Sequence, residues 1–105
     1  MSELEIFNNE EFGQVRSIEV EGEPYFVAKD IAIALGYSDT SDAIKRHVEE
    51  EDKLTRCFTD SGQNRNMIII NESGLYSLIL SSKLPSAKEF KRWITSDVLP
   101  KIRKT

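Results

Sequence analysis

Only one cysteine, Cys57, and one histidine, His47, occur in this chain of 105 residues. A single cysteine excludes an intramolecular disulfide, and the pair cannot supply the four ligands of a structural zinc site within one chain. A catalytic triad would have to use His47, around which no nucleophile-elbow pattern occurs. The five glycines also miss the spacing of a phosphate-binding loop or a dinucleotide fingerprint. These shortages predict a protein that is not an enzyme and carries no metal or cofactor.

Long apolar runs are missing as well. No segment approaches the roughly 20 apolar residues that a membrane-spanning helix needs. The first residues include Glu3 and Glu5, where a secretory leader would be basic and then hydrophobic. We therefore expect a cytoplasmic protein, without membrane contact, that folds as a single domain over residues 1–105.

The net charge of −4 argues against a general affinity for polyanions, but the charges are unevenly distributed. Residues 1–30 contain eight acidic and two basic side chains, a net of −6. Residues 61–105 contain three acidic and eight basic side chains, a net of +5. This asymmetry allows one cationic face on an acidic protein, which phosphate binding requires. The alternative is that the lysines only solvate the outer side of a helix.

Three short strands are predicted at the front of the chain, over Leu4–Phe7, Gln14–Val20 and Pro24–Val27. Apolar and polar residues alternate imperfectly through the second strand, and Glu21–Glu23 supply a turn before the third. The three strands together indicate an antiparallel meander with one half-buried face. We expect the acidic flank of this sheet to face away from any bound DNA.

The segment Lys29–Val48 has the outline of helix, glycine break and helix. Gly36 suits the left-handed conformation that ends a helix, and Ser38, Asp39 or Thr40 can cap the next one. This outline resembles a helix-turn-helix, whose second helix would offer Ser41, Lys45, Arg46 and His47 to phosphates or base edges. Asp39 and Asp42 argue against this role because they would face phosphates. An ordinary helical hairpin in a small core is the alternative.

A second strand pair is predicted over Leu54–Phe58 and Met67–Ile70, joined by a loop over Asp60–Asn66. Cys57 is expected as a small, half-buried strand residue. The loop offers four consecutive polar side chains with the donors and acceptors used on adenine and guanine edges, namely Gln63, Asn64, Arg65 and Asn66. They are either ordinary loop residues or the tip of a DNA-contacting arm.

The last third of the chain predicts an amphipathic helical hairpin. Asn71 can cap the first helix, in which Leu75, Leu78 and Ile79 recur at helical spacing, and Pro85 closes it. Ser86 and Glu89 have the spacing of a capping box. The second helix buries Phe90, Trp93, Ile94 and Val98. Pro100 is expected to end it, before a cationic tail of Lys101, Arg103 and Lys104.

Several blocks in this order resemble the N-terminal domain of the BRO family, a module of phage and prophage antirepressors and of repeated proteins in large DNA viruses. The front and middle blocks are Phe26–Asp30, Leu35–Tyr37, Ala43, Ile44 and His47. The rear blocks are Asn71–Tyr76, Leu84, Pro85, Ala87, Phe90, Trp93, Val98–Pro100 and Arg103. The resemblance covers nearly the whole chain. It implies a nucleic-acid-linked role in transcription regulation, with this chain either a fragment of a longer antirepressor or a short member.

We therefore predict an α+β fold in which small antiparallel strand units pack with about four helices, including a C-terminal helical hairpin. The leading functional hypothesis is a DNA-binding regulatory module. The alternative is a protein-interaction module that binds a phage repressor, or another regulatory protein, without contacting DNA. The candidate nucleic-acid contacts are polar or cationic: Gln63, Asn64, Arg65, Asn66, Lys45, Arg46, Lys88, Lys91, Arg92, Lys101, Arg103 and Lys104.

Overall fold

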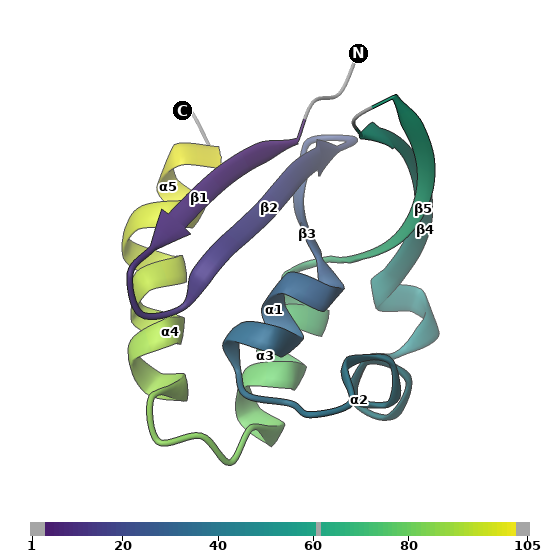
Figure 1. Ribbon diagram of the computed structural model, residues 1–105. Coiled ribbons are helices and arrows are strands. Elements are labelled where there is room, and N and C mark those ends of the chain that lie inside the picture. The colour runs from purple at the N-terminus through teal and green to yellow at the C-terminus, as the bar shows by residue number, and fades with distance from the viewer. Residues whose placement is uncertain (1–3, 61, 103–105) are drawn as a thin grey trace.

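The computed structural model describes residues 4–60 and 62–102. The strands in this part of the chain are β1 (Glu5–Asn9), β2 (Gly13–Val20), β3 (Glu23–Val27), β4 (Lys53–Asp60) and β5 (Gln63–Ile70). The helices are α1 (Ala28–Ala34), α2 (Thr40–His47), α3 (Glu72–Ser81), α4 (Ala87–Trp93) and α5 (Leu99–Ile102). A 3₁₀ turn (Glu50–Asp52) precedes β4, and a π-helical turn (Ile94–Val98) joins α4 to α5 without a break. The predicted α+β class is confirmed (Figure 1).

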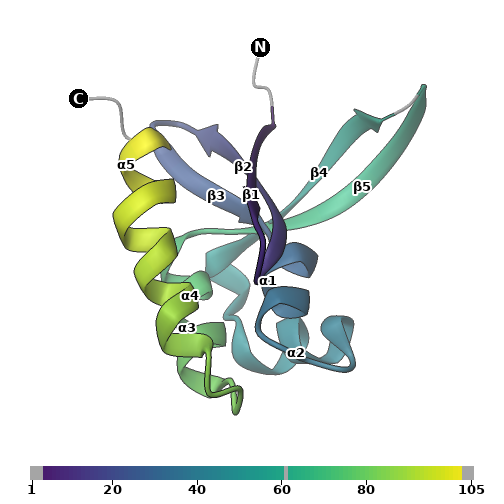
Figure 2. The ribbon, with the colours of Figure 1, turned by 60° about the vertical axis from the view of Figure 1, so that its left-hand side comes forward.

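Within residues 4–60 and 62–102 the strands form one five-stranded antiparallel sheet in the order β1-β2-β3-β5-β4. The two predicted strand units are thus joined, because β3 pairs with β5 through Phe26 opposite Ile70 and Val27 opposite Ile69. These four side chains are all buried, which explains why the junction is held. Beyond these two pairs, β5 separates from β3, and β4 and β5 project together as an arm (Figure 2).

The arm is longer than the sequence predicted. Pairing between β4 and β5 continues to Asp60 opposite Gln63, so Gln63–Asn66 belong to a strand and not to a loop. Polar cross-strand contacts extend the ladder, since the Thr59 hydroxyl donates to Asn64 Oδ1 at 2.9 Å. Gly62, with φ of +78°, allows the tight turn. Cys57 is exposed on this arm, so its predicted half-buried position is wrong.

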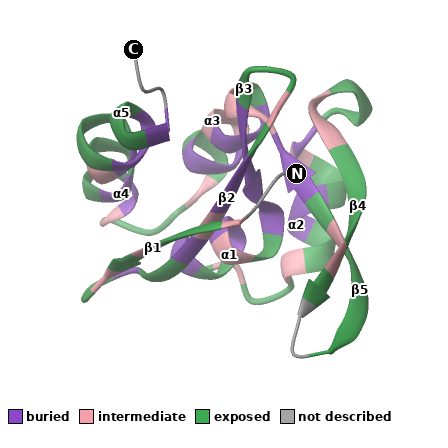
Figure 3. Ribbon diagram, turned by 90° about the horizontal axis from the view of Figure 1, so that it is seen from above, coloured by how far each residue is buried: buried purple, intermediate pink, exposed green. Residues whose placement is uncertain are grey.

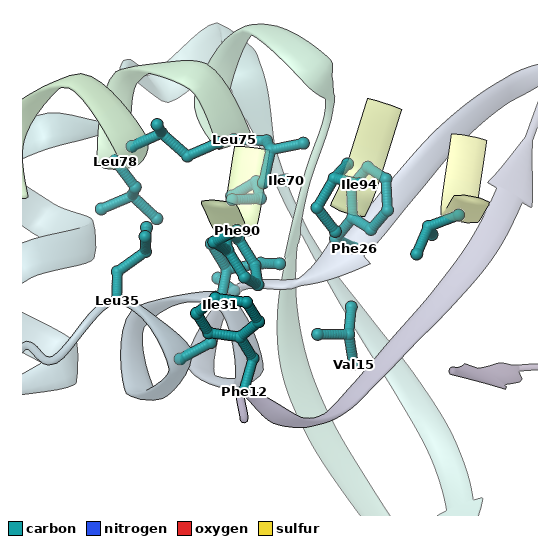
Figure 4. Close-up of a cluster of buried hydrophobic side chains, with 14 of the residues drawn as sticks. Phe12, Val15, Phe26, Ile31, Leu35, Ile70, Leu75, Leu78, Phe90 and Ile94 are labelled. Atoms are coloured by element: carbon teal, nitrogen blue, oxygen red, sulfur yellow. The ribbon is translucent and has the colours of Figure 1, made fainter. Parts of the chain in front are cut away.

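The helices cover the face of the sheet that carries Phe26 and Ile70. This face forms the main core, in which Phe12, Ile31, Leu75, Phe90 and other apolar side chains meet (Figure 4). The pleat turns the intervening residues to the other face, where Ile18, Tyr25, Val27 and Ile69 make a second, smaller cluster. Burial is concentrated at the centre of the molecule, whereas the outer arm is largely exposed (Figure 3).

Local signals at three helix ends act as the sequence predicted. Asn71 Oδ1 accepts from the Gly74 N–H at 3.0 Å at the start of α3, and Asp39 Oδ1 accepts from the Asp42 N–H at 3.0 Å at the start of α2. Gly36 adopts a φ of +80° after α1. The capping box at Ser86 is wrong: its side chain makes no capping bond, because its backbone is already nearly helical (φ −81°, ψ 4°).

The sequence predicted that the C-terminal helix ends at Pro100, and this prediction is wrong. The helix continues to Ile102 through the π turn, where the Leu99 N–H donates to the Ile94 carbonyl. A proline lacks the N–H of a regular helical turn, and the wider π turn directly before it accommodates this loss. Continuation is favoured because Ile94, Val98 and Ile102 are all buried against the core. α3 and α4 run in opposite directions, as the predicted hairpin requires (Figure 1).

Candidate nucleic-acid interface

The arm presents different side chains on its two faces. Cross-strand partners share a face, so Asn64 and Asn66 lie on one face with Thr59 and Cys57. Arg65 and Gln63 lie on the other, with Phe58 opposite Arg65. The four consecutive polar residues Gln63, Asn64, Arg65 and Asn66 are all exposed. The Arg65 guanidinium donates weakly to Gln63 Oε1 at 3.5 Å.

Apolar contacts on one face anchor the arm as far out as the Phe58–Arg65 pair. Phe58 and Met67 are partly buried and pack against the cluster that contains Val27 and Ile69. The outer part has no such support and remains exposed (Figure 3). The arm is therefore fixed in direction at its base while its polar side chains stay accessible.

A groove of about 360 Å³, which we call the arm groove, lies between the arm and the first turns of α1 and α2. Its polar lining consists of Arg16, Lys29, Thr40, Ser41, Arg65 and Asn66. Its apolar lining consists of Val27, Ile44, Met67 and Ile68. The described residues that line this groove thus include three cationic side chains and no carboxylate.

Helix α2 separates the arm groove from a second groove of about 550 Å³. Thr40 and Ser41 line the arm groove, whereas Asp39 and Asp42 line the second groove. The two aspartates that argued against phosphate binding by this helix therefore face away from the arm. Helical spacing places Lys45 one turn beyond Ser41, on the arm side.

Arg46 belongs to the second groove and not to the arm groove. Its Nη1 lies 3.5 Å from Asp42 Oδ2, and both side chains are more than half exposed. His47 lines the same groove, where its ring centroid lies 5.8 Å from that of Tyr37. The Tyr37 hydroxyl donates to the Leu78 carbonyl at 2.8 Å, and burial raises the pKa of this hydroxyl. Lys45 and Arg46, which are adjacent in sequence, are therefore divided between two surfaces.

An ion pair between Arg16 and Asp30 fixes one wall of the arm groove. Arg16 donates from Nε to Asp30 Oδ2 at 2.8 Å and from Nη2 to Oδ1 at 2.9 Å, and its backbone N–H donates to Oδ2 at 3.0 Å. The contact joins β2 to the first turn of α1, next to Lys29. The sequence analysis named neither Arg16 nor Lys29 as a candidate nucleic-acid contact. The only local signal was the position of Lys29 at a junction between strand and helix.

The cationic residues of the C-terminal helix lie elsewhere. Lys88, Lys91, Arg92 and Lys101 are exposed on α4 and α5, and Lys91 Nζ lies 5.9 Å from the centroid of the Tyr76 ring. Figures 1 and 2 show this helix and the arm on opposite sides of the sheet's centre. Arg103 and Lys104 lie outside the described residues. The predicted contacts therefore form two separate groups, one at the arm and α2 and one on the C-terminal helix.

Comparison with known proteins identifies the family. The chain matches the BRO family, N-terminal domain (Bro-N), over residues 14–100. The chain belongs to the BRO family. The match includes every residue that lines the arm groove, but it ends before Lys101, Arg103 and Lys104. It thus covers one predicted group completely and the other only in part.

Relatives of this Bro-N domain occur in viruses and in a bacterium. Bro-N domain-containing protein 289L of Invertebrate iridescent virus 6 is 40% identical, over 77% of this chain and 24% of its own length. An uncharacterized protein of Haemophilus influenzae is 34% identical, over 84% of this chain and 44% of its own length. The uncharacterized Bro-N domain-containing protein ORF2 of Autographa californica nuclear polyhedrosis virus is 29% identical, over 91% and 34%. The chain thus spans less than half the length of each of these relatives. No solved structure matches it.

Ser73 is exposed in the first turn of α3, where its carbonyl accepts from the Ser77 hydroxyl at 3.0 Å. Glu72, Ser73 and Gly74 thus form the first turn of α3. In the part of the Bro-N chain that the structure describes, no helix is long and apolar enough to cross a membrane.

Proposed function

We propose that this Bro-N domain binds duplex DNA through the arm and the adjoining side of α2, as the regulatory module of a phage or prophage antirepressor. One observation carries the proposal. An exposed arm with four consecutive polar side chains borders a groove that has three cationic side chains in its lining and no carboxylate among the described lining residues. The role is binding and not catalysis.

The arm has the form of a two-stranded ribbon, which is narrow enough to enter the major groove of B-DNA. Asn64 and Asn66 offer amide groups of the kind that pair with the adenine edge. Arg65, on the opposite face of the ribbon, offers the guanidinium that pairs with guanine O6 and N7. The Thr59 hydroxyl occupies Asn64 Oδ1, so the amide nitrogen of Asn64 is the group left to donate.

Charge distribution supports this orientation of the domain. The net charge of −4 opposes DNA binding by the molecule as a whole. The exposed acids Glu10 and Glu11 lie in the β1–β2 turn, at the edge of the sheet opposite β4, whereas the exposed acids Glu49, Glu50 and Glu51 lie between α2 and β4. DNA bound along the arm and the Thr40–Ser41 end of α2 therefore meets the cationic groove and avoids Glu10 and Glu11.

A protein partner is the second candidate, and the sheet edge favours it. β4 is an edge strand, and the arm exposes Leu54 and Ile68 at 38% and 40%. An edge strand with apolar side chains can pair with an extended segment of another protein. In this case the domain binds a repressor, or another regulatory protein, and removes it from its operator.

We also propose that the domain functions as one module, residues 1–105, within a longer protein. The matching family is an N-terminal domain, and the viral and bacterial relatives extend well beyond the matched region. The cytoplasm, where a prophage repressor and its operator meet, is the compartment that this role requires.

The test is a binding assay with labelled phage and host operator duplexes at two salt concentrations. Binding through several phosphates should weaken steeply as salt rises, with a log-log slope of about −0.9 for each phosphate neutralised. A parallel experiment is a pull-down of purified repressor by the same domain. If no duplex binds at low salt while the repressor is retained, DNA binding is wrong and the protein-partner function replaces it.

A further inference from the structure

We propose that the arm groove is a seat for one phosphate of the DNA backbone and that Lys29 is its principal ligand. The inference rests on the proposed DNA-binding function and adds to it a residue that is not among the contacts predicted from the sequence. In this arrangement the arm contacts base edges, while residues of α1 and α2 contact the DNA backbone beside it.

Lys29 has the accessibility and the charge that this role requires. It is exposed in the first turn of α1 and lines the groove. Among residues 4–60 and 62–102 it takes part in no ion pair, unlike Arg16, Arg46 and Lys53. Its charge is therefore not neutralised locally.

The neighbouring carboxylate does not oppose an anion at this position. Asp30 follows Lys29 directly in sequence, but its side chain is only 10% exposed and is engaged by three hydrogen bonds from Arg16. Arg16 thus neutralises the acid nearest to Lys29. Lys29 therefore supplies a positive charge to the groove that no carboxylate among the described lining residues offsets.

The start of α2 completes the lining with neutral donors. Thr40 and Ser41 place hydroxyl groups in the groove, and hydroxyls are common donors to DNA phosphates. The acids of the same helix, Asp39 and Asp42, line the second groove instead. An anion in the arm groove therefore meets the Lys29 ammonium from α1 and two hydroxyl-bearing residues from the start of α2.

A phosphate held here would set the register of the arm. Phosphate contacts fix a protein's position and orientation on a duplex, whereas base contacts carry sequence specificity. The Lys29 contact should therefore contribute alike to every duplex. A phosphate bound in the arm groove would also limit how deeply the arm can enter the major groove of the DNA.

The experiment compares Lys29→Gln with Lys83→Gln for binding to two short duplexes, one of arbitrary sequence and one of the preferred sequence, over a series of salt concentrations. Lys83 lines the second groove, so its substitution removes the same charge from the other side of α2. Lys29→Gln should reduce the magnitude of the log-log salt slope by about 0.9. When the salt concentration rises fourfold, the variant should therefore lose about 3.5-fold less affinity than the unaltered domain loses. Lys29→Arg should restore the slope, and thermal unfolding should show that all variants are folded.

The outcomes separate this inference from the function on which it rests. Equal effects of Lys29→Gln and Lys83→Gln would indicate a general charge effect and overturn the phosphate seat while DNA binding stands. An effect confined to the preferred duplex would indicate that Lys29 contacts a base, and it would also overturn the phosphate seat. If the unaltered domain binds no duplex at low salt, the proposed function fails and the phosphate seat fails with it.

Discussion

Asp30 accepts three hydrogen bonds from Arg16, one from the backbone N–H and two from the guanidinium. The side chains are 10% and 24% exposed, so the pair is largely removed from solvent. It ties β2 to the start of α1, directly beside the arm groove. A single ion pair thus serves both the fold and the surface on which the proposed function depends.

Asp30→Ala should lower the free energy of unfolding by about 2 to 3 kcal/mol, because the half-buried guanidinium of Arg16 loses its charged acceptor. Urea denaturation measures the effect. Asp42→Ala is the matched control, since it removes an exposed carboxylate from Arg46 and should cost below about 1 kcal/mol. Similar losses for the two variants would show that the Arg16 pair is not a special support of the fold.

Gly74 is a second position where a small change should matter. A Cβ added there would lie 3.1 Å from Ile70 Cβ and 3.1 Å from Val48 Cγ1. Glycine to alanine in a helix normally gains about 1 kcal/mol, but crowding in a packed core costs about 1 to 3 kcal/mol. We expect Gly74→Ala to be destabilising in chemical denaturation. Ser73→Ala, at the exposed neighbouring position, should be close to neutral, and a more stable Gly74→Ala protein would contradict this packing.

Trp93 packs between helix and sheet without being fully buried. Its ring stacks on Phe12 of the β1–β2 turn, with centroids 6.3 Å apart, and lies 6.0 Å from Phe90. Trp93→Ala should therefore destabilise the domain by about 2 to 4 kcal/mol, whereas Trp93→Phe should retain much of the stability. A loss below about 1 kcal/mol for Trp93→Ala would indicate a surface anchor for a partner instead.

Local signals in the sequence were sufficient for elements whose ends are fixed by near neighbours. Asn71 caps α3, and Gly36 ends the α1 segment with the expected positive φ, because each bond or dihedral depends on residues within one turn. Non-local contacts were not predictable in this way. The β3–β5 junction at Phe26 and Ile70 depends on burial that only the assembled sheet provides.

The errors have the same physical origin. The helix continues through Pro100 because Val98 and Ile102 gain burial against the core, which outweighs the local preference of proline. The arm extends because pairing with β4 draws polar residues such as Asn64 into a strand. For the candidate site, the sequence supplied the polar residues of the arm. The sequence could not show that Arg16 and Lys29 lie beside these arm residues, because the groove brings together residues of β2, α1 and β5.

The two groups of predicted DNA contacts can be distinguished by mutation. Lys88, Arg92 and Lys101 lie on the C-terminal helix, away from the arm (Figure 2). If DNA lies along the arm and α2, replacing these three residues by glutamine should change the log-log salt slope by well under the ~0.9 expected for each lost phosphate contact. A slope reduced by one to three such contacts would place the duplex on the C-terminal helix and overturn the arm as the interface.

Arg65 tests the contact at the arm itself, because its position permits two roles. As a base contact, Arg65→Ala should weaken binding to the preferred duplex by about 1 to 3 kcal/mol and binding to random DNA much less. As a phosphate contact, it should weaken both alike and reduce the salt slope by about 0.9. Because Arg65 shares a face with Gln63 and projects from an exposed strand, we expect the sequence-dependent result. Paired titrations on preferred and random duplexes measure it, and Lys29→Gln supplies the uniform loss expected of a backbone contact for comparison.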